Sequence, residues 1–203
     1  ASRDDVDINR LACAGCSGGG TVATYLAVLE PRIRATVVVC YTTSRRAWLD
    51  TGELADAEQV QEGAIEQGVD HADLLAAFAP RPLLVCCGTR DFFPVEGTRW
   101  TVDQVRRLYV LLGAGDRVDI HEADLGHGYQ ASHRLATGRW LARWLLNEDS
   151  AGHDTEDPPL DSEEDLHAAP GGQTANLGSR TVFSFTMDEA VRLAKSRAIS
   201  QPE

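Results

Sequence analysis

The sequence lacks the features of several large protein classes. No apolar run approaches the roughly 18 residues that a membrane helix needs, so we expect no membrane segment. The five cysteines are odd in number and follow neither a disulfide framework nor a zinc-site spacing. We therefore expect no metal and no organic cofactor. No secretory signal pattern is visible, and the compartment is left open, with the unpaired cysteines slightly favouring the cytoplasm.

Basic charge is also scarce. The chain has 19 Lys and Arg against 31 Asp and Glu, and its formal net charge is −12 at pH 7. Nine of the acids lie between Glu148 and Asp165, where no Lys or Arg occurs. The rest of the chain is nearly neutral and has no basic stripe that would indicate nucleic-acid binding. Residues 148–175 are predicted to form an acidic, disordered linker, with an acidic binding tail as the alternative.

The most informative motif is Gly-Cys-Ser-Gly-Gly at residues 15–19. It follows a short apolar run at residues 11–14 and precedes a predicted helix over residues 21–30. A serine between glycines at a strand-to-helix turn is typical of a nucleophile elbow, which exposes the serine hydroxyl. Ser17 is therefore a candidate nucleophile. The alternatives are an idle serine in a glycine-rich turn and a thiol nucleophile at Cys16.

A serine nucleophile needs a base and an orienting carboxylate. Residues 83–87 form an apolar run that predicts a buried strand, and Asp91 follows its end. Residues 117–121 predict another strand, after which His127 lies between two glycines. The order Ser17, Asp91, His127 is the order in which enzymes with this elbow place their triad. All three are expected at the carboxyl ends of the strands, where open α/β sheets carry their sites.

Other acids and histidines compete for these roles. Asp124 is the alternative orienting acid, although Asp91 follows its own strand. His121 is expected to be a partly buried strand residue, and His133 is expected to face solvent a turn into the last helix. His71 lies in a segment, residues 44–79, that forms either a cap over the site or an ordinary connecting helix pair.

Residues 6–147 resemble the C-terminal part of an α/β-hydrolase catalytic domain, closest to the prolyl-oligopeptidase-like and acetyl-xylan-esterase-like branch. The resemblance rests on four stretches: VDINR at 6–10 leading into the serine motif, APRPLL at 79–84, GTRDFFP at 88–94 and GHG at 126–128. It implies an α/β fold with a mostly parallel sheet flanked by helices. It also implies a Ser17–His127–Asp91 triad that hydrolyses carboxylic esters or amides, with the Gly18 N–H in the oxyanion hole.

The sequence departs from that family at its beginning. The strands that precede the nucleophile strand in a complete domain are absent, as is the loop that supplies the second oxyanion donor. We therefore expect a truncated catalytic fragment with little activity alone. Its exposed sheet edge is expected to allow self-association.

The resemblance favours an esterase acting on acylated carbohydrate or another small ester. A serine peptidase is the alternative, and a non-catalytic fragment that serves as an interaction module is a hypothesis of a different class. A helix is predicted over residues 101–112, where Thr101 and Gln104 suggest a capping box. Another is predicted over 129–146, where Trp140 and Trp144 favour the core over a sugar platform. A short strand at 181–185 and a helix over 186–197 are predicted in a final segment, residues 176–203, of unassigned role.

Overall fold

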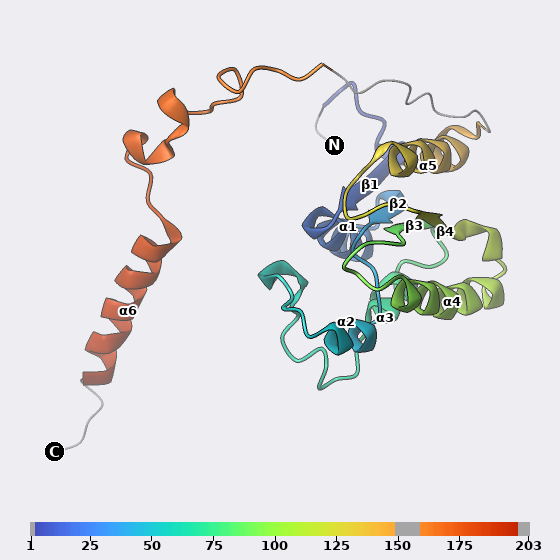
Figure 1. Cartoon of the computed structure of the whole chain (residues 1–203), viewed down its shortest axis with the longest axis horizontal. Coiled ribbons are helices and arrows are strands. Elements are labelled where there is room, and N and C mark those ends of the chain that lie inside the picture. Colours follow the sequence, from blue (N-terminus) through green and yellow to red (C-terminus); the bar gives the residue numbers. More distant parts are fainter. Residues whose placement is uncertain (1–2, 149–158, 199–203) are drawn as a thin grey trace. The chain divides into compact units, whose positions relative to one another are not determined.

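The computed structural model describes residues 3–148 and 159–198. The chain forms two compact units, Ala1–Thr155 and Glu156–Glu203, which we call the first and second units. Figure 1 shows the strands and most of the helices in the first unit, and a single long helix in the second.

The first unit is built on a four-stranded parallel sheet in the order β1-β2-β3-β4. The strands are β1 (Leu11–Cys16), β2 (Ile33–Val39), β3 (Leu83–Gly88) and β4 (Val118–Ala123). Because all four strands run in the same direction, their carboxyl ends share one edge of the sheet. This confirms the predicted α/β class with a parallel sheet.

Helices and short helical turns connect the strands. In the first unit they are η1 (Ile8–Arg10), α1 (Gly18–Leu29), α2 (Arg45–Thr51), η2 (Ala57–Gln59), α3 (His71–Ala76), α4 (Val95–Leu111), η3 (Gly115–Arg117), α5 (Ala131–Leu141) and the π-helical turn η4 (Ala142–Leu146). The segment between β2 and β3 thus contains two short helices and one 3₁₀ turn. None of the described helices is both long and apolar enough to cross a membrane.

Two apolar clusters cover the two faces of the sheet. Val38 and Val85 belong to the cluster under α1, α3 and α4. Val37, Leu84 and Trp140 belong to the cluster under α5. Successive strand residues point to opposite faces, so a strand buried on both sides reads as a continuous apolar run. The prediction that Trp140 is a core residue is confirmed, since only 7% of it is exposed.

Several predicted helix boundaries were wrong. Helix α1 begins at Gly18 rather than residue 21. Helix α4 begins at Val95 after Pro94, six residues before the expected start at Thr101. Thr101 lies inside the helix and is buried, and its hydroxyl donates to the Thr43 carbonyl at 3.1 Å instead of capping. The last helix begins at Ala131 rather than residue 129 and changes to a π turn after Leu141. In α4 a tertiary hydrogen bond thus uses the hydroxyl that the local pattern assigned to a cap.

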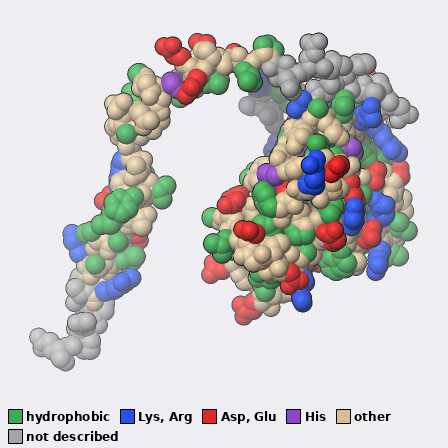
Figure 2. Space-filling view, in the orientation of Figure 1, with side chains coloured by type: hydrophobic (Ala, Val, Ile, Leu, Met, Phe, Trp, Pro, Cys, Tyr) green, Lys and Arg blue, Asp and Glu red, His purple; other side chains and the backbone are tan. Residues whose placement is uncertain are grey.

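The second unit contains η5 (Pro170–Gly172), η6 (Thr174–Leu177) and α6 (Val182–Ala198). The expected strand at 181–185 was wrong, because α6 begins at Val182 and the Thr181 hydroxyl accepts from the Ser184 N–H at 3.2 Å. An isolated strand leaves its backbone groups unpaired, whereas a helix pairs them internally. Apolar side chains stay exposed along α6, as Figure 2 shows, including Val182 at 83% and Phe183 at 73%.

The predicted linker falls only partly within the described residues. Residues 149–158 lie outside them. Residues 159–175 contain turns and short 3₁₀ segments, and nearly all of their side chains are exposed. The proposed disorder of this stretch stays a prediction.

Candidate active site

Ser17 lies at a sharp turn between β1 and α1. Its backbone angles are φ 57° and ψ −124°, which a residue other than glycine rarely adopts. Its N–H donates to the Val39 carbonyl at 2.9 Å, which fixes the turn against β2. A Cβ atom on Gly15 would lie 2.0 Å from the Gly19 carbonyl oxygen, so only glycine allows this approach of helix to strand. The predicted strand–turn–helix setting of Ser17 is confirmed.

His127 is paired with Asp91. Its Nδ1 atom lies 3.0 Å and 3.1 Å from the two carboxylate oxygens of Asp91. The Asp91 side chain is 1% exposed and the His127 side chain 27%. Asp91 also accepts a hydrogen bond from the Phe93 N–H at 3.2 Å, which orients the carboxylate.

The two candidate orienting acids, Asp91 and Asp124, have different partners. Asp124 is exposed and pairs with Arg90 and with the Thr89 hydroxyl. A Cβ atom on Gly88 would lie 2.4 Å from the Leu125 carbonyl oxygen, so the missing side chain lets the loop that carries His127 approach the end of β3. Of the two candidate acids, Asp91 is therefore the one that can hold the imidazole.

Two residues that were not predicted to belong to the site, His133 and Cys40, hold the loop that carries His127. The Gly128 carbonyl accepts from His133 Nδ1 at 2.8 Å and from Cys40 Sγ at 3.6 Å. The prediction that His133 faces solvent was wrong, because it is fully buried. The buried residues of α5 are His133, Thr137 and Trp140, a helical spacing that would have placed His133 on the same face as Trp140.

The strand order decides how these residues meet. Ser17 follows β1 and Asp91 follows β3, with β2 between them. Two strand spacings correspond to roughly 10 Å, a gap that the loop after β4 must cross for an imidazole to reach a serine. The contact of the Gly128 carbonyl with Cys40, directly after β2, places this loop across the gap. Within the described residues, the Ser17 hydroxyl makes no hydrogen bond to His127.

Aromatic side chains surround the exposed side of the imidazole. Phe92 stacks on His127 with ring centroids 4.3 Å apart, and Phe93 lies at 5.9 Å. Trp48, from α2, stacks on Phe93 at 4.8 Å. These rings exclude water from one side of the Asp91–His127 pair, and a lower local dielectric strengthens such a contact.

The amino end of α1 contacts an acidic side chain. A Cβ atom on Gly18 would lie 2.7 Å from Oε1 of Glu58. Glu58 belongs to η2, so the segment between β2 and β3 reaches the residue expected to donate to an oxyanion. A carboxylate there is attracted by the helix terminus and opposes a second negative charge.

Cys40 lies close to the pair on its buried side. Its Sγ atom, an Asp91 oxygen and a His127 nitrogen all lie within 4.8 Å of one another, a set that can hold a metal ion. Burial raises the pKa of the Cys40 thiol to about 12, so it is neutral at pH 7. Burial also raises the pKa of Cys16, which disfavours a thiolate nucleophile next to Ser17.

The other histidines have structural partners. The buried His71 accepts a hydrogen bond from the Thr43 N–H at 3.2 Å, and burial lowers its pKa to about 4. His121 contacts the Ser132 hydroxyl at 2.8 Å and is partly buried in β4, as predicted.

No family model matches this sequence. It is 27% identical over 146 residues to YtaP of Bacillus subtilis (strain 168), a hydrolase by name. This match covers 71% of the chain and 49% of YtaP. The chain therefore spans about half the length of the curated relative that it matches.

Several solved structures share the fold. A carbohydrate esterase family 15 glucuronoyl esterase from Caldicellulosiruptor kristjansonii matches with a TM-score of 0.62 and 17% identity, over 79% of this chain and 50% of that one. The glucuronoyl esterase catalytic domain from Hypocrea jecorina matches with a TM-score of 0.57 and 16% identity, over 81% and 52%. Methylesterase BT1017 matches with a TM-score of 0.55 and 27% identity, over 70% and 31%. The first unit of this chain therefore has part of the α/β-hydrolase fold.

Proposed function

We propose that this chain carries the Ser17–His127–Asp91 triad of a carboxylic ester hydrolase. The observation that carries the proposal is the buried carboxylate of Asp91 at 3.0 Å from Nδ1 of His127, on the same sheet edge as the strained turn at Ser17. This contact leaves Nε2 of His127 as the ring nitrogen for the serine proton. His127 Nε2 takes the proton from the Ser17 hydroxyl while its oxygen attacks the acyl carbonyl.

The remaining steps use groups at the same edge. The Gly18 N–H, at the amino end of α1, stabilises the oxyanion together with the helix dipole. His127 then protonates the leaving alcohol, and water releases the acyl group from Ser17 by the reverse sequence of proton transfers. Asp91 accepts the hydrogen bond from Nδ1–H, which fixes this tautomer and stabilises the imidazolium.

The proposed substrate class is an ester attached to a carbohydrate. Two named neighbours are glucuronoyl esterases and a third is a methylesterase, which favours a sugar ester over a peptide. Closeness to acetyl-xylan esterases or to prolyl oligopeptidases stays a prediction. Contacts of Trp48 and Glu58 around the site favour a cap role for residues 44–79, which would form a wall of the acyl or alcohol pocket.

Covalent labelling tests the nucleophile. The full chain, and any longer protein that contains it, is treated with a fluorophosphonate probe, and the adduct is mapped by mass spectrometry. We expect the adduct on Ser17, its loss in Ser17→Ala and its retention in Cys16→Ser. An adduct that survives Ser17→Ala would refute the triad.

Turnover tests the substrate class. The measurement compares kcat/KM for a methyl ester of glucuronic acid, an aryl acetate and a peptide anilide. We expect either ester to exceed the anilide. A clearly higher kcat/KM for the anilide would favour the peptidase alternative. Absence of both substrate turnover and fluorophosphonate labelling would favour a non-catalytic fragment.

A further inference from the structure

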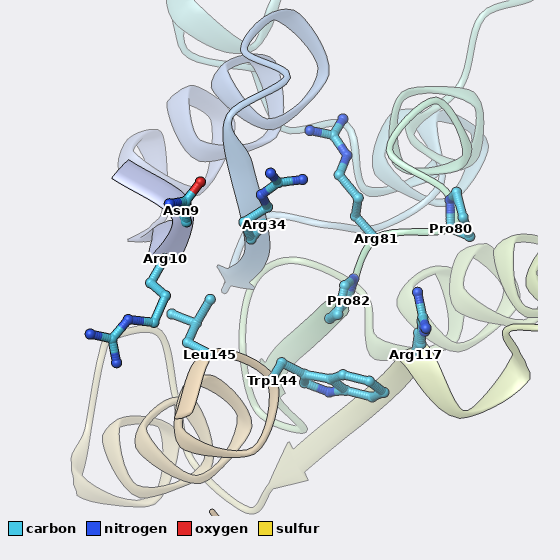
Figure 3. A pocket seen from close by; sticks show the side chains of 9 residues that line it. All are labelled: Asn9, Arg10, Arg34, Pro80, Arg81, Pro82, Arg117, Trp144 and Leu145. Atoms are coloured by element: carbon cyan, nitrogen blue, oxygen red, sulfur yellow. The ribbon is translucent and has the colours of Figure 1, made fainter. Parts of the chain in front are cut away.

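Arginines gather at the edge of the sheet opposite Ser17. Arg10 directly precedes β1, Arg34 is the second residue of β2, Arg81 lies just before β3, and Arg117 directly precedes β4. Because the strands are parallel, these four positions share the amino-end edge of the sheet. They line one pocket of about 410 Å³, which Figure 3 shows. We call it the arginine pocket.

Two of the four guanidinium groups already have polar partners within the protein. Arg10 pairs with Asp7 at 2.6 Å. Arg81 is fixed by carbonyl oxygens, among them those of Ala27 at 2.8 Å and Ile33 at 3.0 Å. In the part of the chain that the structure describes, neither Arg34 nor Arg117 has a carboxylate within ion-pair distance.

The lining of the pocket contains no acidic side chain. Arg34 lies close enough to Arg81 that its charge adds to the effect of burial in lowering the pKa of Arg81. Like charges held together in a chain with a net charge of −12 form a local positive field. An anion bound between the guanidinium groups would offset their mutual repulsion, so the pocket favours anion binding.

The other walls fit an organic body. Pro82, Trp144 and Leu145 line the same pocket, and the Arg117 guanidinium lies 5.6 Å from the centre of a Trp144 ring. The indole nitrogen of Trp144 is buried and has no hydrogen-bond partner. A volume of about 410 Å³ lies within the range of small-molecule pockets. The planar fork of arginine matches a phosphate group better than it matches a neutral ligand.

We propose that the arginine pocket binds a small phosphorylated molecule, with Arg34 and Arg117 on the phosphate and the apolar wall against its carbon body. The site lies at the other end of the strands from Ser17, about 20 Å away along a six-residue strand. It is therefore a second binding site and does not depend on the proposed ester hydrolysis.

Calorimetry on the full chain tests this site with three probes: glucose 6-phosphate, inorganic phosphate and glucose. We expect saturable binding of a phosphate-bearing probe and none of glucose. Tighter binding of glucose 6-phosphate would identify a phosphate ester as the ligand, and equal or tighter binding of inorganic phosphate would identify the free ion. The double variant Arg34→Gln/Arg117→Gln is expected to bind about tenfold more weakly or worse, because it loses two charge-assisted contacts.

The controls keep the test decisive. Arg107→Gln removes the same charge at an exposed position of α4 outside the pocket and is expected to bind as the wild type does. A fluorescence change on binding that Trp144→Phe abolishes would report the pocket directly, and circular dichroism checks the fold of each variant. Absence of phosphate binding by the wild type at 10 mM probe would overturn the proposal. Equal binding by wild type and the double variant would also overturn it.

Discussion

The ring of Phe92 stacks on the imidazole of His127, with centroids 4.3 Å apart and planes inclined by 29°. Phe92 is itself 52% exposed, so its ring covers one face of the histidine while its other face contacts solvent. Aromatic pairs of this kind stabilise by about 0.5–1.5 kcal/mol beyond area burial. The stacking therefore bears on the orientation of the imidazole more than on the stability of the core.

Removing this ring is expected to slow the reaction of Ser17. We expect Phe92→Ala to lower the rate constant of fluorophosphonate labelling roughly threefold to tenfold, because the imidazole loses one of its orienting contacts. Trp100→Ala removes a similarly exposed aromatic side chain, at 49%, from α4 and serves as the control. Equal rates for the two variants would show that Phe92 does not position His127.

The two candidate acids are distinguished by amide substitution. In a longer, active protein that contains this chain, we expect Asp91→Asn to lower kcat by about 10⁴, since an amide in this position favours the wrong imidazole tautomer. Asp124→Asn is expected to keep activity within about twofold, because it breaks only exposed contacts with Arg90 and Thr89. The opposite ranking in ester turnover would assign the orienting role to Asp124.

The carboxylate next to Gly18 is expected to oppose the oxyanion. Glu58→Gln removes this charge with little change of shape, and we expect kcat/KM for an ester to rise about twofold to fivefold at low salt. The gain is expected to shrink as salt is added, because exposed charges are screened. Glu53→Gln, in the same segment, is the control for net charge. An unchanged or lower kcat/KM in Glu58→Gln alone would contradict this expectation.

His71 makes stability depend on pH. Burial lowers its pKa from the ordinary value of about 6.5 to about 4, so the unfolded chain binds its proton first as pH falls. The stabilising contribution is present above pH 6.5 and is lost between pH 6.5 and 4, by up to about 3 kcal/mol. Urea unfolding at several pH values measures this loss.

A variant that cannot titrate isolates this effect. Asn at position 71 can still accept a hydrogen bond from the Thr43 N–H through its side-chain oxygen. We expect His71→Asn to be less stable at pH 7 but to lose less of its unfolding free energy between pH 6.5 and 4. An identical pH dependence in wild type and variant would assign the slope to other groups.

The free side of β1 is expected to promote self-association. Strand β1 is an edge of the sheet and pairs only with β2 among the described residues. An edge of this kind is a template for another chain, and a lysine on it opposes pairing. Light scattering is expected to show association that rises with concentration in the wild type and falls in Ala14→Lys. Val22→Lys, on the exposed side of α1, is the control. A monodisperse wild-type monomer at all concentrations would contradict this.

The sequence alone determined the order of the strands along the chain and the position of the three candidate residues at their ends. The continuous apolar run at residues 83–87 is typical of a strand in the middle of a sheet covered on both sides, which is where β3 lies. The glycines that flank Ser17 predict the sharp turn from the local sequence, since only certain backbone angles join a strand to a helix in so few residues. These features depend on neighbours in the chain and are readable from it.

Only the tertiary structure decided which side chains meet. Helix α4 begins at Val95, and Thr101 bonds to Thr43 instead of capping, because packing against a distant loop outweighs a local motif. The Gly128 carbonyl accepts from His133, five residues further along the chain, and from Cys40, 88 residues away and directly after β2. No local sequence pattern predicts the contact with Cys40. Residues 182–185 belong to helix α6 rather than to a strand, because the described part of the second unit offers no strand to pair with them. Local propensity limits the secondary structures that each segment can form, and long-range hydrogen bonds and burial decide which of these the folded chain adopts.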